Sequence, residues 1–172
     1  MSMRYLVILI FIIGLASCSS MLVNTDYDPS YDFSKLKTYY WVPNPTIREQ
    51  NRLFEKHFQK IMGEKLAEKG ITLDETNPDF LIAYYGNVQR KIDVQNWGYR
   101  YPGWYGGLEV YQYDEGTMVV DFVDAKTKDL IYRGTVKAEV NRGSMDAEKR
   151  QKRITEAVEK ILKNFPPNSK NK

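Results

Sequence analysis

The sequence predicts an α+β fold, an antiparallel or mixed sheet of about five strands with two main helices packed on one face. Two strand-like segments, Thr117–Asp124 and Leu130–Val140, are joined by the short polar segment Ala125–Asp129, which is typical of an antiparallel hairpin. Two amphipathic helical segments, Thr46–Lys69 and Asp146–Asn164, accompany the strands. Hairpin-linked strands with a few helices favour a sheet that is covered on one side.

The first half of the chain alternates strands with one long helix. Met21–Tyr27 reads as a strand that ends at Asp28-Pro29, and Thr38–Val42 is rich in aromatic and β-branched residues. Pro43-Asn44-Pro45 stops the second strand, and Gly70 stands where a helix C-cap is expected. The helix between them has apolar residues at helical spacing, namely Phe54, Phe58, Ile61, Met62 and Leu66.

The remaining strands and the second helix follow from alternation and helical spacing. Ile71–Leu73 is a candidate short strand, and Phe80–Lys91 alternates apolar and polar residues after a turn at Asn77-Pro78-Asp79. In Leu130–Val140 the even-numbered residues are apolar or small and the odd-numbered ones are largely polar. The last helix has one apolar stripe and ends at Pro166-Pro167; the stripe comprises Ile154, Ala157, Val158, Ile161, Leu162 and Phe165.

The N-terminal segment has the layout of a secretory signal peptide. One positive charge precedes the apolar run Tyr5–Leu15, whose 11 residues are fewer than the roughly 20 that a spanning helix needs. Leu15-Ala16-Ser17-Cys18 resembles the bacterial lipobox, which implies cleavage before Cys18, a diacylglyceryl thioether on its sulfur and an acylated new N-terminus. An ordinary secreted protein with a chance cysteine at this place is the alternative. The residue after Cys18 is Ser19. An aspartate at this position would favour retention of a lipoprotein at the inner membrane, so a serine favours location in the outer membrane.

Length and composition are consistent with one domain. We expect a signal peptide at residues 1–17, a lipidated tether at 18–25, a single α+β domain at 26–167 and a polar tail at 168–172. The formal net charge of the full sequence is only +3, which is too small for a nucleic-acid-binding surface. Cys18 is the only cysteine, so the chain can form no internal disulfide.

Short motifs along the chain resemble a known family. They begin with Asp26-Tyr27-Asp28-Pro29 and Lys37-Thr38-Tyr39-Tyr40-Trp41, continue with Pro78-Asp79-Phe80-Leu81 and Tyr132-Arg133-Gly134-Thr135, and end with Phe165-Pro166-Pro167. In this order they are similar to an uncharacterised bacterial lipoprotein family built on a domain of unknown function. The resemblance implies an exported, lipid-anchored α+β domain. It implies no reaction and supplies no catalytic residues.

The residues offer little catalytic chemistry. Acylation would block Cys18 as a nucleophile, and His57, the single histidine, lies beside the apolar stripe of its helix, where a structural role is expected. A zinc site would need several His or Cys ligands. Asp121 and Asp124 are three residues apart on a strand and so point to opposite faces, and Asp124 is placed to open the following turn. We therefore predict no catalytic residue, metal or cofactor.

The segment Trp97–Tyr113 stands out, because Trp and Tyr alternate there with glycines and a proline. Glycine and proline disfavour a regular helix, so a loop or irregular hairpin is expected. Exposed aromatic rings suit stacking on sugars or docking a protein. The rings could instead cover the open face of the sheet or rest against lipid headgroups. The candidate binding residues are Trp97, Tyr99, Arg100, Tyr101, Trp104 and Tyr105.

These observations lead to one functional hypothesis and one alternative. The hypothesis is a non-enzymatic lipoprotein of the bacterial envelope that is anchored through Cys18 in the membrane, with the outer membrane as the expected location. It binds an envelope protein or a cell-wall glycan through the aromatic segment, and it does not bind nucleic acid. The alternative is a carboxylate-dependent hydrolase of envelope glycans.

Overall fold

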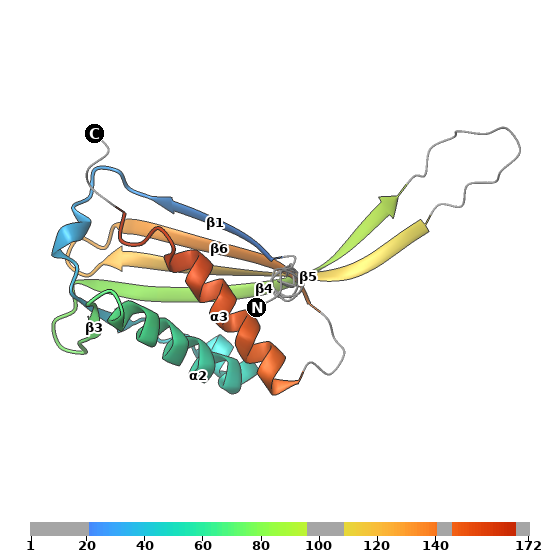
Figure 1. Ribbon diagram of the computed structural model, residues 1–172, viewed down its shortest axis with the longest axis horizontal. Helices are drawn as coiled ribbons and strands as arrows, with labels where there is room; N and C mark the ends of the chain where they lie inside the picture. Colours follow the sequence, from blue (N-terminus) through green and yellow to red (C-terminus); the bar gives the residue numbers. More distant parts are fainter. Residues whose placement is uncertain (1–20, 96–108, 141–145, 168–172) are drawn as a thin grey trace, which may run out of the picture.

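The computed structural model describes residues 21–95, 109–140 and 146–167. They form a six-stranded mixed sheet with two α-helices (Figure 1), which confirms the predicted α+β fold class with slightly more strands than expected. The elements in chain order are β1 (Met21–Tyr27), the 3-10 helix η1 (Phe33–Lys35), β2 (Thr38–Trp41), α2 (Pro45–Ala67), β3 (Thr72–Leu73), β4 (Phe80–Gln95), β5 (Glu109–Asp124), β6 (Leu130–Val140) and α3 (Ala147–Leu162).

The strand order across the sheet is β1-β6-β5-β4-β2-β3. The pairs β1–β6, β5–β6 and β4–β5 are antiparallel, whereas β2 runs parallel to both β4 and β3. The predicted hairpin of β5 and β6 is present. Its turn is built by Asp124, whose Oδ1 accepts hydrogen bonds of 2.8 Å from the backbone N–H groups of Lys126 and Thr127.

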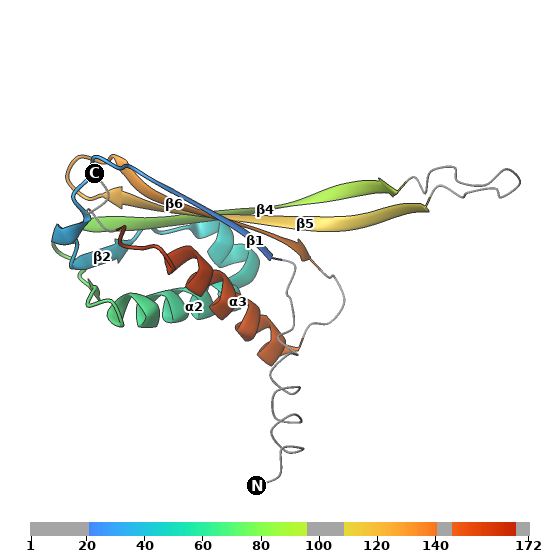
Figure 2. The ribbon, with the colours of Figure 1, turned by 45° about the horizontal axis from the view of Figure 1, so that its top comes forward.

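Both helices lie on the same face of the sheet (Figure 2), as the sequence predicts. Side chains close the N-termini of both helices. Asn44 Oδ1 accepts a hydrogen bond from Ile47 N at 3.0 Å, and Asp146 Oδ1 accepts one from Lys149 N at 2.7 Å. An ion pair of 3.1 Å between Lys65 of α2 and Glu159 of α3 joins the helices nearer their C-terminal ends.

The core lies between the helices and the sheet. Phe165, which follows α3, is 1% exposed and packs edge-on against Phe122 of β5 and Tyr132 of β6, with ring centroids 4.6 and 5.0 Å away. The Phe-Pro-Pro motif that ends the helical stripe therefore also closes the core. The largest fully buried side chains are those of Tyr84, Tyr132, Phe58, Phe80, Phe122, Phe165, Met62, Leu66, Ile71, Ile82, Ile131 and Ile161.

Most predicted boundaries differ by one or two residues, but β4 and β5 are much longer than predicted. β4 continues to Gln95 and β5 already begins at Glu109, because the two strands keep pairing for several residues beyond the expected ends. Tyr111 and Tyr113, for which the sequence predicts a loop or an irregular hairpin, consequently belong to β5. Residues 21–25 of the expected tether likewise lie in β1, paired with β6.

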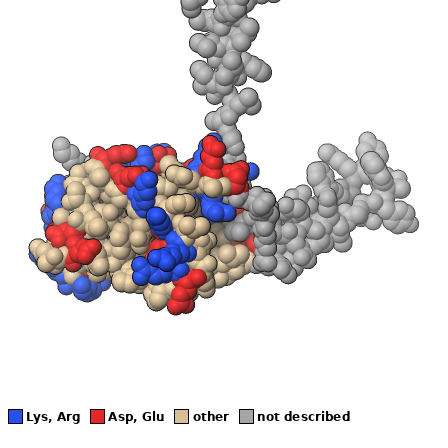
Figure 3. Space-filling model, turned by 90° about the horizontal axis from the view of Figure 1, so that it is seen from below, with Lys and Arg blue, Asp and Glu red and all other residues tan. Residues whose placement is uncertain are grey.

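The surface carries both signs of charge. Lys and Arg are interspersed with Asp and Glu on the face seen in Figure 3. None of the helices formed by the described residues is long and apolar enough to cross a membrane.

Candidate functional site

The most distinctive feature of the fold is the projecting end of the β4–β5 hairpin. The pairing of β5 with β6 reaches Asp114 opposite Val140, whereas the pairing of β4 with β5 continues to Gln95 opposite Glu109. The hairpin therefore extends well past the helices (Figure 1). The hairpin leads to residues 96–108, which lie outside the described residues. This range holds all the predicted binding residues, Trp97, Tyr99, Arg100, Tyr101, Trp104 and Tyr105. Cys18 also lies outside the described residues.

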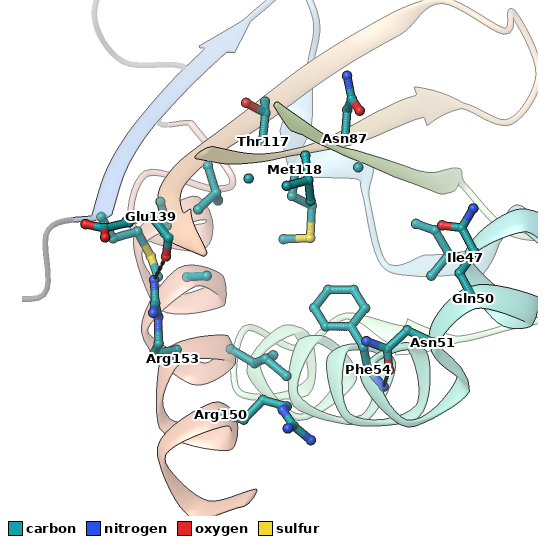
Figure 4. Close-up of a pocket in the computed structure, with 18 of the residues that line it drawn as sticks. Ile47, Gln50, Asn51, Phe54, Asn87, Thr117, Met118, Glu139, Arg150 and Arg153 are labelled. Carbon is teal, nitrogen blue, oxygen red and sulfur yellow. Dashed lines mark hydrogen bonds between the residues drawn. The ribbon is translucent and has the colours of Figure 1, made fainter. Parts of the chain in front are cut away.

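A second feature, which the sequence analysis missed, is a groove of about 990 Å³ on the helix-covered side of the sheet (Figure 4). It lies between the N-terminal parts of α2 and α3 and the adjoining strands. Most of its interior is apolar, with side chains from β1, α2, β5 and α3, among them Met21, Ile47, Phe54, Met118 and Ile154. No local sequence pattern marks it, because the lining residues come from six separate stretches of the chain.

Local structure in α2 shapes one wall of the groove. Asn51 departs from helical geometry with φ −155° and ψ 71°, and its Oδ1 accepts a hydrogen bond from Phe54 N at 3.0 Å, which restarts the helix. The first part of α2 is fixed to the sheet by Asn44, whose Nδ2 donates to Tyr84 O at 2.5 Å. Phe54 then faces the groove opposite α3 (Figure 4).

Two glycines lie in the strands that form the floor of the groove. In β4 and β5 the even-numbered residues, such as Tyr84 and Val120, face the helices. Gly86 and Gly116 occupy such positions beside the groove. A Cβ atom at Gly86 would meet only Thr117 O, at 3.5 Å. A side chain there would fit the backbone and would reduce the volume of the groove.

Polar groups lie along the α3 side of the groove. Arg153 Nη2 donates a hydrogen bond of 2.9 Å to Glu139 O of β6, and Arg150 lies one turn earlier on the helix (Figure 4). Arginine and glutamate together give this side no single sign of charge. The groove thus combines a largely apolar interior with charged side chains along one side.

The acidic residues on β5 do not form a catalytic pair. Asp121 faces the side of the sheet away from the helices, where it is held by Arg133 through bonds of 2.6 and 2.7 Å and accepts a bond of 3.1 Å from Tyr85 Oη. Asp124 faces the other side and accepts a bond of 2.5 Å from Tyr31 Oη. The expected opposite orientation and the turn-forming role of Asp124 are confirmed.

Hydrogen bonding sets the ionisation of two buried groups. Burial alone would raise the pKa of Asp124, but bonds from Tyr31 and from the backbone N–H groups of Thr127 and Lys126 outweigh it and lower this pKa to about 2. Burial and a hydrogen bond to Glu55 raise the pKa of Tyr84 to about 12. Both groups keep one charge state at neutral pH, which suits structural roles.

His57 and metal sites complete the survey of reactive groups. His57 is half-buried in α2, and its Nδ1 is buried without a hydrogen-bond partner in the described part of the chain. Residues 21–95, 109–140 and 146–167 contain no cluster of three or more His, Cys, Asp or Glu side chains that could hold a metal ion.

A family model matches residues 23–167, which is most of the chain, and the family is described as a domain of unknown function, DUF4136. The chain belongs to this family. The match confirms the predicted resemblance to an uncharacterised lipoprotein family built on such a domain. No curated protein is significantly similar to the chain in sequence.

Solved structures share the fold of this DUF4136 domain. A PDZ domain protein from Parabacteroides distasonis aligns with a TM-score of 0.56 and 17% identity, over 86% of this chain and 36% of that one. The chain thus spans about a third of that protein, and the likeness shows the fold alone. Weaker likenesses are the PelC dodecamer from Paraburkholderia phytofirmans (TM-score 0.47, 13% identity, 83% and 94% coverage) and a minor lipoprotein from Acinetobacter baumannii (0.41, 10%, 75% and 91%).

Proposed function

We propose that this DUF4136 protein is a non-enzymatic lipoprotein of the bacterial envelope, anchored through Cys18, that binds an envelope protein or a cell-wall glycan with the end of the β4–β5 hairpin. The observation that carries the proposal is the projection of the hairpin beyond the sheet. Its last paired residues, Gln95 and Glu109, border a segment with two Trp and three Tyr residues.

The projecting hairpin favours contact over structural cover. Rings that served only to cover the open face of the sheet would need a chain that folds back across that face. β4 and β5 instead stay paired to Gln95 and Glu109, past the point where the pairing of β5 with β6 ends, and the two strands extend beyond the helices (Figure 2). Tyr and Trp on such an extension can reach a partner with little rearrangement of the domain.

The lipid anchor agrees with the position of β1. The chain enters the sheet at Met21, only three residues after Cys18, so the domain would sit close to the membrane surface. Several acyl chains on Cys18 would give firm attachment, since one chain alone binds only marginally. The outer membrane is the proposed location because Ser19 follows Cys18.

The binding proposal is tested by a triple variant, Trp97→Ala, Trp104→Ala and Tyr105→Ala. The wild type should either be retained on purified cell wall or capture a protein partner by crosslinking in intact cells, and that binding should fall at least tenfold in the variant while the circular dichroism spectrum stays that of the wild type. The matched control is Tyr27→Ala, Leu53→Ala and Leu73→Ala, which removes three side chains that are 46%, 61% and 51% exposed on the body of the domain. Equal retention of both triple variants and the wild type would contradict the proposal.

A further inference from the structure

The groove begins at a residue that is close in sequence to the proposed lipid attachment point. Met21 is the first described residue, and its side chain lines the groove from β1. Cys18 precedes it by three residues, and three residues span about 10 Å at full extension. The sulfur of Cys18 is therefore within reach of the groove mouth without any change in the sheet.

The lining of the groove suits a hydrocarbon chain. Its volume of about 990 Å³ lies at the upper end of the roughly 300–1,000 Å³ typical of ligand sites. Met21, Phe54, Met118 and Ile154 supply apolar contacts from four different elements. Methionine side chains adapt readily to a flexible ligand, because they are unbranched and polarizable.

The polar side chains of the groove already make contacts within the protein. Arg153 already donates to Glu139 O, and Arg150 and Glu139 also take part in polar interactions. A carboxylate or phosphate would have to compete with these contacts. An acyl chain in ester or amide linkage carries no charge and has only a weakly polar end.

We propose that the groove receives one acyl chain of the lipid anchor on Cys18. This inference rests on the lipidation in the proposed function and extends it by giving one chain of the anchor a second location besides the bilayer. The protein then keeps part of its own anchor out of water while it is away from a membrane. The remaining chains stay available for insertion.

The test uses the full protein, made in bacteria that are fed a fatty acid bearing a diazirine. The protein is purified in detergent, the detergent is removed, and the sample is irradiated and analysed by peptide mass spectrometry. Crosslinks from the acylated N-terminal peptide should fall on groove segments 46–54, 116–118 and 150–157. Crosslinks confined to other segments would overturn the proposal.

A matched pair of variants tests whether the groove itself is required. Ala138 and Lys137 are neighbours on β6, but Ala138 lines the groove beside Met21 and Lys137 is exposed on the opposite face. Ala138→Trp should lower the crosslink yield in the groove about tenfold and make the detergent-free protein aggregate on gel filtration. Lys137→Trp should behave as the wild type. Equal yields for the two variants would overturn the proposal.

Two further experiments test whether the groove instead binds a free lipid or the acyl chain of a second copy of the protein. Cys18→Ser protein is mixed with the free diazirine fatty acid. Labelling of its groove, with none in the lipidated protein, would assign the groove to a free lipid and overturn the proposal. A mixture of 15N-labelled and unlabelled lipidated protein shows whether crosslinks join two copies, which would also overturn it.

The mass of the N-terminal peptide distinguishes a failure of the proposed lipid anchor from a failure of the groove inference alone. An unacylated Cys18 would refute the anchor, and with it both proposals. An acylated Cys18 without groove crosslinks would refute the inference alone.

Discussion

Gly134 of β6 lies directly beneath Ile161 of α3. A Cβ atom at residue 134 would come within 2.7 Å of Ile161 Cγ2 and 3.0 Å of Ile161 Cγ1. The helix can lie this close to the sheet only because residue 134 has no side chain. The same approach lets Tyr132 Oη donate a hydrogen bond of 2.6 Å to Ile161 O, which ties the last turn of α3 to the strand.

Replacing Gly134 should therefore destabilise the domain. We expect Gly134→Ala to lower the free energy of unfolding by about 1–3 kcal/mol, as is typical of overpacking a core. Urea denaturation followed by circular dichroism measures the change. The matched control is Gly86→Ala, because a Cβ at residue 86 meets only Thr117 O at 3.5 Å. Similar losses in the two variants would show that α3 can shift at little cost.

Asp124 should make stability depend on acid pH. Its pKa is lowered from 3.8 to about 2 in the folded chain, so the ionised form contributes stability above pH 4. That contribution, about 2 kcal/mol, is lost as the pH falls through 2. Asp124→Asn keeps an acceptor oxygen without the charge. Its deficit in unfolding free energy against the wild type should be largest at pH 6 and should shrink towards pH 2. A deficit that is constant across this range would contradict the assignment.

Tyr84 and Glu55 should be coupled across the core. Tyr84 Oη donates a hydrogen bond of 3.0 Å to Glu55 Oε1, and Glu55 is only 8% exposed. Tyr84→Phe would leave this carboxylate without its buried donor, at a cost of about 1–3 kcal/mol in unfolding free energy. Tyr85→Phe is the control. Its hydroxyl also contacts a carboxylate, that of Asp121, but Arg133 still holds that group through two bonds. Chemical denaturation of both variants should therefore show the larger loss for Tyr84→Phe.

Cys18 should decide whether the protein is membrane-bound. We expect the wild type to incorporate an alkyne-bearing palmitate and to sediment with membranes. Cys18→Ser should lose the label and remain in the soluble fraction after cell lysis, because no other residue offers a thiol. Ser17→Ala, which keeps a small residue before the cleavage site, is the control and should be labelled. Labelled Cys18→Ser protein would show that the acyl group is attached elsewhere.

Much of the fold follows from local sequence patterns. β1 and β6 have the predicted bounds, and both helices begin within one residue of the positions that their capping residues and prolines indicate. Apolar residues at helical spacing select which side of α3 is buried, and Ile154, Val158 and Ile161 are all in the core. These features are predictable because spacing, capping and turn chemistry act over a few residues.

The candidate site is less predictable. The length of the β4–β5 hairpin depends on pairing between residues 14 or more positions apart in sequence, so the sequence leaves a loop and a hairpin open for Tyr111 and Tyr113, and only the structure places them in β5. The groove depends on Met21, Phe54, Met118 and Ile154, which no local pattern connects. The aromatic residues Trp97–Tyr105 can be recognised from composition, and the structure adds that the strands on either side of this segment are paired up to Gln95 and Glu109.

The sequence by itself determined the family, the α+β class, the helical faces and the expected attachment point at Cys18, since each of these depends on residues near one another in the chain. Only the tertiary structure decided the strand order, the projection of the hairpin and the groove beside Met21. These features arise where distant segments pack, because strand pairing and helix docking bring together residues whose separation in sequence gives no indication of their contact.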